Sequence, residues 1–406
     1  SSSNGLEKRP KLRFPGFDEP YRSAQLGDIA SLVNRTDPKS NAPIMMLSAG
    51  KGFIMQSEKY SRDNAGQSLK KYILLKKGEL AYNHGASKAK QYGCCYELTE
   101  DEARIPYVYH CFKVSGTEHT PYVATALNNP KMDRQLKRLV SSSVRMDGLL
   151  NISFDDYMSV ILRLPSLKEQ THIAVFLKKL DERITAQEKL VESLKKYKRG
   201  LISEILNQKI RITHEDEKWE EVSLSAVADG FEYGMNAAAT IFDGVHKYIR
   251  ITDIDDDSHT YIDSAPVSPA GVLEGKYRVR ENDILFARTG ASVGKSYLYQ
   301  ASDGDMYFAG FLIRIHVIDG VDSGYVFLNT LTEEYNRWVA LESTRSGQPG
   351  INAEQYRRYR FKLPPLETQK QISAIAQKID AQIKRESQCL RLLQKQKDGF
   401  LQQLFI

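Results

Sequence analysis

LPSLKEQTHIAVFLKKLDERITAQEKLVESLKKYKRGLISEIL, residues 164–206, is the stretch that decides the fold of this chain. It returns 199 residues later, without a gap, as LPPLETQKQISAIAQKIDAQIKRESQCLRLLQKQKDGFLQQLF at residues 363–405. The residues identical at this offset include Leu164, Pro165, Leu167, Gln170, Ile173, Asp181, Ile184, Leu194, Lys196, Lys198 and Gly200. A repeat with a period near half of the 406 residues indicates a tandem duplication.

Apolar residues in both copies recur in alternating steps of four and three, which we call the seam. The first seam consists of Ile173, Leu177, Leu180, Ile184, Val191, Leu194, Leu201 and Ile205, and the second of Ile372, Ala376, Ile379, Ile383, Leu390, Leu393, Phe400 and Leu404. Steps that average 3.5 residues are typical of helices wound around each other. Polar residues interrupt the seams at matching places, Gln187 with Glu386 and Lys198 with Lys397. Such groups fix the register of a coiled coil, so we predict two long helices that pair.

The starts of these helices differ in their capping residues. Ser166 with Glu169 predicts a capping box, in which the hydroxyl and the carboxylate satisfy free amides. The second copy has Pro365 in place of Ser166, so Thr368 with Gln371 is the candidate substitute.

Composition sets wide bounds on function. The chain is 41% hydrophobic and 10% aromatic, as ordered globular proteins are, and no apolar run approaches a membrane span. The first residues lack an apolar core, so we expect no secretory signal. Cys94, Cys95, Cys111 and Cys389 include no C-x-x-C pair, which favours reduced thiols in a cytoplasm and neither zinc nor disulfides. The formal charge of +6 permits a nucleic-acid partner without requiring one.

The remaining sequence predicts two mixed globular domains that alternate with the helices. We expect an N-terminal arm at 1–20, a first globule at 21–163, a first helix at 164–208, a second globule at 209–362 and a second helix at 363–406. Short apolar runs bounded by polar turns predict strands at 44–47, 72–75, 80–82, 108–114, 248–251, 284–287 and 311–317. Helices are expected at 122–127, 132–140, 325–331 and 335–341. The fold class is therefore α+β, with a pseudo-two-fold repeat.

Polar turns follow equivalent predicted strands in the two globules. The first contains Asn83, His84 and Ser87, and the second contains Arg288, Thr289, Ser292 and Lys295. The second resembles a phosphate loop, but Thr289 stands where the first glycine is required and one residue is missing before Gly-Lys-Ser. Both turns are candidates for contacts with DNA bases, and plain solvated turns are the alternative.

A second pair of candidate segments precedes the long helices. RMDGLLNI at 145–152 offers Arg145 and Asn151, and RSGQPGIN at 345–352 offers Arg345, Gln348 and Asn352. The planar heads of Arg, Gln and Asn bond two atoms of guanine or adenine at once, although a tight turn explains these segments equally well. Lys51, Arg250 and Lys295 are candidate phosphate contacts or ordinary surface charges. The acidic run 253–257 indicates a solvated turn rather than a metal site, because no second ligand cluster accompanies it.

Catalytic motifs are lacking in the sequence. The eight histidines are scattered, and Asn128-Asn129-Pro130 lacks the Pro-aromatic pair that completes the amino-methyltransferase motif. We find no helicase motor motif and no nuclease carboxylate–lysine set. We therefore expect a protein that is not itself an enzyme and that holds no metal.

Two globules alternating with two matched helices, each opening L-P-x-L-x-x-Q, resemble the specificity subunit (HsdS) of a Type I restriction–modification system. The resemblance rests on LPSLKEQTHIAVFLKKLDERI, on LPPLETQKQISAIAQKIDAQI and on the turn-and-strand pattern at 278–290. It implies that each globule is a target recognition domain for half of a split DNA sequence. It also implies that the paired helices separate the halves and that the seam residues support both pairing and docking of two modification subunits. Those subunits would hold S-adenosylmethionine and methylate adenine, and motor-nuclease subunits can join them.

Helix length agrees with this interpretation. Forty residues at 1.5 Å per residue extend about 60 Å, a length on the scale of one to two DNA turns. Because the globules differ in sequence, the DNA sequence is expected to be asymmetric. A stand-alone DNA methyltransferase with divergent motifs, and a coiled-coil scaffold whose globules bind protein, are the alternatives.

Overall fold

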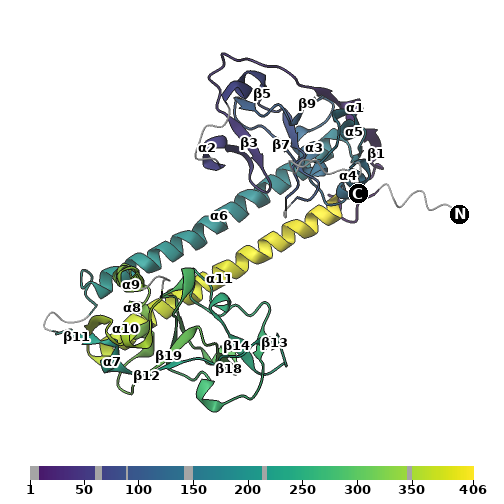
Figure 1. Ribbon diagram of the computed structural model, residues 1–406. Coiled ribbons are helices and arrows are strands. Elements are labelled where there is room, and N and C mark those ends of the chain that lie inside the picture. Colours follow the sequence, from purple (N-terminus) through teal and green to yellow (C-terminus); the bar gives the residue numbers. More distant parts are fainter. Residues whose placement is uncertain (1–8, 60–65, 88–89, 141–149, 213–216, 345–349) are drawn as a thin grey trace. The chain divides into compact units, whose positions relative to one another are not determined.

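The computed structural model describes residues 9–59, 66–87, 90–140, 150–212, 217–344 and 350–406. The chain forms two compact units, Ser1–Glu188 with Gln388–Ile406 and Lys189–Ser387. Each unit contains one globule and half of each long helix, α6 (Leu167–Leu206) and α11 (Leu366–Leu404). Figure 1 shows the labelled elements of both units.

A four-stranded antiparallel sheet in the order β2-β9-β6-β7 forms the centre of the first unit. A ribbon, β1 with β10, leads into α6, and two further pairs, β3 with β4 and β5 with β8, complete the globule. The strands of this unit are β1 (Arg22–Gln25), β2 (Ala30–Leu32), β3 (Met45–Ser48), β4 (Gly52–Met55), β5 (Ile73–Lys76), β6 (Leu80–Asn83), β7 (Cys94–Glu97), β8 (Glu102–Ile105), β9 (His110–Val114) and β10 (Ile161–Leu164). Its shorter helices are α1 (Leu26–Ile29), α2 (Gln56–Lys59), the 3₁₀ helix η2 (Gly66–Lys71), α3 (Thr120–Leu127), α4 (Asp133–Leu139) and α5 (Phe154–Met158).

The second unit repeats the sheet and the ribbon but not the other strand pairs. Its sheet has the order β12-β19-β16-β17, and its ribbon is β11 with β20. In place of the antiparallel pairs β3·β4 and β5·β8 it has antiparallel β13 with β15 and parallel β14 with β18. Its strands are β11 (Glu220–Ser223), β12 (Ala228–Tyr233), β13 (Ala239–Ile241), β14 (Lys247–Ile249), β15 (Val267–Pro269), β16 (Asp283–Ala287), β17 (Ser296–Leu298), β18 (Met306–Phe308), β19 (Leu312–Val317) and β20 (Arg360–Leu363). Its helices are α7 (Leu224–Val227), α8 (Ser323–Asn329), α9 (Glu333–Ser343), α10 (Ala353–Arg357) and the 3₁₀ turns η3 (Ile251–Asp253), η4 (Gly275–Tyr277), η5 (Gly290–Ser292) and η6 (Ala301–Asp303).

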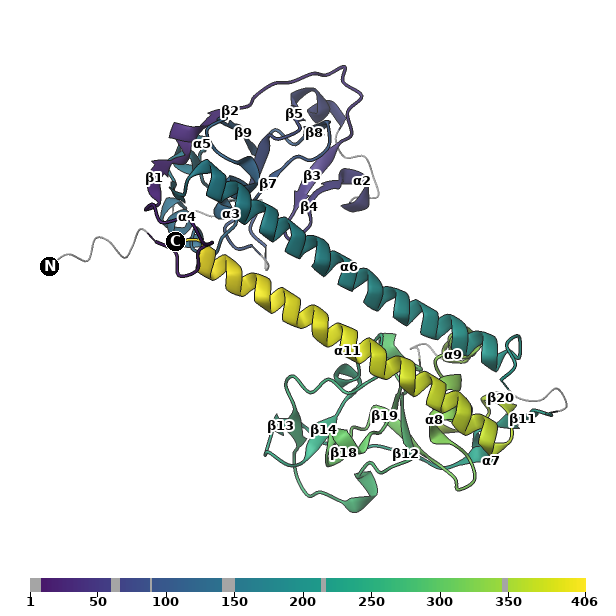
Figure 2. The ribbon, with the colours of Figure 1, turned by 180° about the vertical axis from the view of Figure 1, so that it is seen from behind.

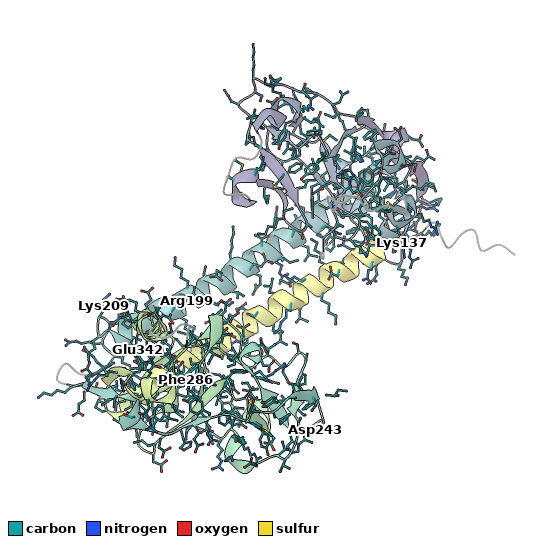
Figure 3. The ribbon with its side chains drawn as sticks, viewed as in Figure 1. Lys137, Arg199, Lys209, Asp243, Phe286 and Glu342 are labelled. Atoms are coloured by element: carbon teal, nitrogen blue, oxygen red, sulfur yellow. The ribbon has the colours of Figure 1, made fainter. Side chains whose placement is uncertain are left out.

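Each sheet packs its apolar face against short helices and against one end of the long helices. In the first unit Phe112 and Tyr122 share a core with Ile173 and Leu177 of α6 and with Leu404 of α11. In the second, Phe286 and Tyr325 share a core with Ile205 of α6 and Ile372 of α11. Phe286 is fully buried and is labelled in Figure 3. The amphipathic pattern of the long helices therefore serves two kinds of packing, against a globule at the ends and against the other helix elsewhere.

The predicted strands and helices of both globules are all present, with bounds shifted by a few residues. The long helices begin at Leu167 and Leu366, three residues later than the repeat, because Leu164 and Leu363 still belong to β10 and β20. Each of these leucines precedes a proline, and the proline ring disfavours helical dihedrals in the residue before it. The predicted α+β fold with two long helices is confirmed.

Within each unit the segments of α6 and α11 run side by side in opposite directions (Figures 1 and 2). All seam residues are buried or half-buried. Two polar seam residues form ion pairs across the helices: Lys198 Nζ lies 2.7 Å from Asp380 in the second unit, and Lys397 Nζ lies 2.5 Å from Asp181 in the first. Lysine and aspartate are each repeated at the 199-residue offset, so the two pairs are equivalent.

A buried glutamine explains why L-P-x-L-x-x-Q is retained in both copies. The Gln170 amide donates to Pro165 O at 3.0 Å and accepts the His119 amide at 2.9 Å. Gln369 donates to Pro364 O at 2.7 Å and accepts the Asp322 amide at 2.9 Å. Each side chain thus ties the turn before a long helix to the start of α3 or α8, and we call it the glutamine clamp.

The capping predictions need correction. The Ser166 hydroxyl accepts the Glu169 amide at 3.4 Å, but the Glu169 carboxylate bonds Arg13 and Tyr21 instead of closing the box. Thr368 is inside α11 rather than before it, and its hydroxyl donates to Glu217. At both starts, residues outside the helix therefore bond the side chain that was predicted to close the cap.

The described part of the N-terminal arm is docked on the first unit. Arg13 pairs with the fully buried carboxylate of Glu169 at 2.8 Å. The Leu12 amide donates to Gln403 O at 3.0 Å, and the Phe14 and Phe176 rings meet edge to face at 5.6 Å. Residues 9–20 are accordingly part of the first unit.

Candidate nucleic-acid interface

In each unit the structure brings the two predicted segments together at the end of one central strand. Leu150 of the first unit donates its amide to His84 O at 2.9 Å, just after β6. Ile351 of the second donates its amide to Arg288 O at 2.9 Å, just after β16. Because β6 and β16 occupy the same place in the two sheets, the candidate sites are equivalent.

The first-unit site contains a packed aromatic group. His84 is buried, and its ring lies 4.9 Å from that of His110 on β9 and 6.3 Å from that of Tyr82. His110 Nε2 lies 2.9 Å from Ile152 O, and burial lowers the pKa of His110. The histidines therefore form part of the support beneath the turn rather than its exposed surface.

The other polar residues of the first site have local roles. Asn83 Oδ1 accepts the Gly85 amide at 2.9 Å, and Ser87 Oγ accepts the Lys90 amide at 3.0 Å. Asn151 is exposed, as is Lys51, which lies in the turn between β3 and β4. Together with Ser87, which is also exposed, Asn151 and Lys51 are therefore the described candidates of this unit whose side chains are open to solvent.

The second-unit site is built around Arg288. Its Nε donates to Gly310 O at 3.1 Å, and its guanidinium lies 5.0 Å from the Tyr233 ring and 6.0 Å from the Phe311 ring. Tyr233 and Phe311 are both exposed, and sequence analysis did not single them out. Thr289 forms a bridge with Gly350, which joins the turn to the segment before α10.

A hairpin turn connects β16 to β17, with the short η5 inside it. The Ala287 amide donates to Lys295 O at 2.8 Å and the Gly294 amide to Ala287 O at 2.9 Å. Gly294 has a φ of 88°, and a Cβ there would lie 2.6 Å from Val339, so glycine is required. A phosphate loop connects a strand to an α-helix, whereas this turn connects two strands. The structure therefore agrees with the conclusion that this segment is not a phosphate loop.

Two predicted phosphate contacts already hold carboxylates. Arg250 bonds Asp253 through Nε and Nη2, both at 2.8 Å, and this carboxylate raises the pKa of Arg250. Lys295 pairs with Asp256 and donates to Ile254 O at 3.0 Å. Lys295 and Ser292 line a hollow of about 510 Å³ with Asp255, Asp256 and Asp257. The acidic lining favours neither residue as a phosphate contact.

Asn352 also has a structural role, since its side chain caps α10 by accepting the Gln355 amide at 2.9 Å. Arg145, Arg345 and Gln348 lie outside the described residues. Within the described ranges, no group of three His, Cys, Asp or Glu side chains is placed to hold a metal. None of the described helices has the length and apolarity needed to cross a bilayer.

Comparison with known proteins adds independent information. Residues 216–394 match the family model described as the Type I restriction modification DNA specificity domain. The putative type I restriction enzyme MjaX specificity subunit of Methanocaldococcus jannaschii is 25% identical over 209 residues. That match covers 49% of this chain and 48% of the relative, so the chain spans about half the length of the curated relative it matches.

Two solved structures share the fold over nearly the whole chain. The Type-I restriction-modification S subunit from M. genitalium has a TM-score of 0.58 at 12% identity and covers 98% of this chain and 99% of its own. A chain from a study of complex assembly and conformational transition of the type I R-M system has a TM-score of 0.57 at 16% identity, over 97% and 99%. At these identities the likeness establishes the fold.

Proposed function

We propose that this chain is a specificity subunit of a Type I restriction–modification system, that it recognises an asymmetric, bipartite DNA sequence and that it catalyses no reaction itself. The match of residues 216–394 to the specificity-domain family supports this proposal. Each globular unit recognises one half of that sequence. The family description supplies DNA specificity, and the division into two half-sites rests on the two units.

One observation carries the proposal: the two units share a frame but differ at the equivalent ends of β6 and β16. The frame consists of the four-stranded sheet, the ribbon and the glutamine clamp. At the end of β6 the first unit has the buried His84. At the end of β16 the second unit has Arg288 beside exposed aromatic rings. A common frame that displays different side chains is the arrangement expected for two recognition sites of different sequence.

The long helices are proposed to set the number of unread base pairs and to dock two copies of a modification subunit. The seam residues are used in pairing, so docking would use the outer faces, where Val175, Leu190, Tyr197 and Leu392 are exposed. S-adenosylmethionine would be held by the modification subunits, and motor-nuclease subunits would add restriction.

Methylome mapping of a host that carries this chain with its modification subunit tests the proposal. We expect methylated adenines within one split sequence whose two halves differ and whose gap has a fixed length. A methylated sequence that is continuous or palindromic would contradict it. So would S-adenosylmethionine binding by the purified chain in calorimetry, which would indicate a stand-alone methyltransferase. Absence of any split sequence after selection of the complex on random DNA would favour a protein-binding scaffold.

A paired insertion tests the spacing role separately. Four residues, about one helical turn and 6 Å, are inserted after Glu188 and after Ser387, which are equivalent in the repeat. The gap is expected to grow by one or two base pairs while both half-sites stay the same. The matched control carries the insertion in α6 alone, which moves one seam out of register. An unchanged gap in the paired variant would refute a spacing role.

A further inference from the structure

We infer that Arg288 contacts a guanine in the half-site of the second unit and determines specificity there. The inference rests on the proposed function and extends it to one residue and one base. Arg288 combines a fixed backbone, an oriented guanidinium and terminal NH₂ groups that pair with no carboxylate of the described residues, a combination that the other described candidates lack.

The backbone of Arg288 is held from both sides. Its amide donates to Phe311 O at 3.1 Å, and its carbonyl accepts the Ile351 amide at 2.9 Å. It directly follows β16, the fully buried central strand of the sheet. A side chain on such a support loses little additional freedom when it binds, which favours a specific contact.

The guanidinium is oriented by three groups. Nε donates to Gly310 O at 3.1 Å, while the Tyr233 and Phe311 rings lie within cation–π distance. The Tyr233 hydroxyl in turn accepts the Ala353 amide at 3.2 Å, which fixes that ring against the start of α10. Bonding at Nε leaves the far end of the guanidinium, formed by one N–H of each terminal nitrogen, for a second partner.

Arg288 differs from three other cations of the second unit because no described carboxylate pairs with it. Arg250, Arg278 and Lys295 hold Asp253, Asp305 and Asp256 respectively. Each of these would have to break an ion pair before it contacted DNA. Arg288 has instead two aromatic neighbours, which leave its hydrogen-bonding edge available.

Guanine is the base that this edge fits. Its O6 and N7 are acceptors at the spacing of two guanidinium N–H groups, and no other base offers two acceptors on its major-groove edge. Phe311 is 61% exposed and flanks the guanidinium, a position suited to contact with the neighbouring base or sugar. The geometry therefore assigns Arg288 to one G·C pair.

Selection on random DNA, with the chain in complex with its modification subunit, tests the assignment. The wild type is expected to prefer guanine at one position of the second-unit half-site by roughly 5- to 140-fold. Arg288→Ala should abolish that preference and leave the gap and the other half-site unchanged. Arg288→Lys, which keeps the charge but not the two-pronged geometry, should lose most of it.

Two further variants separate specificity from charge and from folding. Arg278→Ala, a cation of the same unit paired with Asp305, should leave every base preference intact. Phe311→Leu should weaken the guanine preference several-fold without changing the preferred base. Thermal unfolding establishes that each variant is folded.

The outcomes are distinguishable. Loss of affinity that is uniform over all sequences in Arg288→Ala would make Arg288 a phosphate contact and overturn the inference, as would an unchanged guanine preference. In both cases the split site, and with it the proposed function, would stand. If the wild type itself enriches no split sequence, the proposed function fails as well.

Discussion

The two globular units differ least near the long helices and most away from them. Both have the sheet, the ribbon, the glutamine clamp and a lysine–aspartate pair between the helices. They differ in their remaining strand pairs, antiparallel β3·β4 and β5·β8 against antiparallel β13·β15 and parallel β14·β18. Duplication has therefore retained the parts that position the proposed recognition surface, while the remaining strand pairs have diverged.

The largest effect on stability is expected at a position where the two frames differ. Glu169 is fully buried and pairs with Arg13, whereas the equivalent Thr368 bonds Glu217. Arg13→Met leaves a buried carboxylate without its cation and should destabilise the first unit by about 3–5 kcal/mol. Hydrogen exchange of β9 should accelerate, while β19 in the second unit stays protected. Arg9→Met, at an exposed arginine, is the control, and equal acceleration of β19 would contradict the expectation.

The glutamine clamp should matter in both units. Gln170→Leu or Gln369→Leu leaves the amide of His119 or Asp322, respectively, and the carbonyl of Pro165 or Pro364 without its glutamine partner. Gln170→Leu also removes the bond that Gln170 Nε2 donates to the buried Glu118 carboxylate at 2.6 Å. We expect a loss of about 2–4 kcal/mol in the unit that carries the substitution. Urea unfolding followed by hydrogen exchange of β9 and β19 measures it, with exposed Gln371→Leu as the control. A loss confined to one of the two variants would show that the clamp is not part of the shared frame.

The lysine–aspartate pairs should make a smaller and symmetric contribution. Lys198→Glu places two negative charges together and is expected to cost about 1 kcal/mol, because Asp380 is half exposed. Adding Asp380→Lys should restore most of the loss, and Lys397→Glu with Asp181→Lys should behave alike. Thermal unfolding of the single and double variants gives the free energies of a double-mutant cycle. Failure of the double variants to recover would contradict a register role.

The smallest expected effect concerns pH. Burial lowers the pKa of His110, so the unfolded chain binds its proton more readily than the folded one. Stability of the first unit should therefore fall as pH drops from the ordinary histidine value, about 6.5, towards the lowered value. His110 and Ile313 pair with equivalent central-strand residues, Tyr82 and Phe286. His110→Ile should accordingly reduce the loss of hydrogen-exchange protection in β9 at acidic pH. An unchanged dependence of that protection on pH between 7 and 5 would contradict this account.

The sequence predicted the parts of the fold that rest on periodicity. The seams identified both long helices, and the apolar runs identified strands such as β6 and β16. The strands β13 and β15, with three residues each, have too few residues for a period to be visible. Their pairing depends on contacts between residues far apart in the sequence, which no local pattern records.

The candidate site was predicted in position but not in detail. The turn at Arg288 and the segment before α10 were both identified, and the structure joins them. The partners Tyr233 and Phe311 come from β12 and from the turn before β19, and only the folded chain places them beside Arg288. Likewise, Lys295 resembles a phosphate contact in sequence because Asp256, its partner, is 39 residues away. Ion pairing between distant segments is the information that residue type alone lacks.

The equivalent lysine–aspartate pairs have one more consequence. Since α6 carries both Asp181 and Lys198, and α11 both Asp380 and Lys397, each helix is charge-complementary to an antiparallel copy of itself. These pairs do not distinguish the partner in the same chain from a helix of another molecule. The covalent connection does, because it holds the internal partner at an effective concentration on the order of millimolar. Connectivity, rather than charge, selects which helices pair.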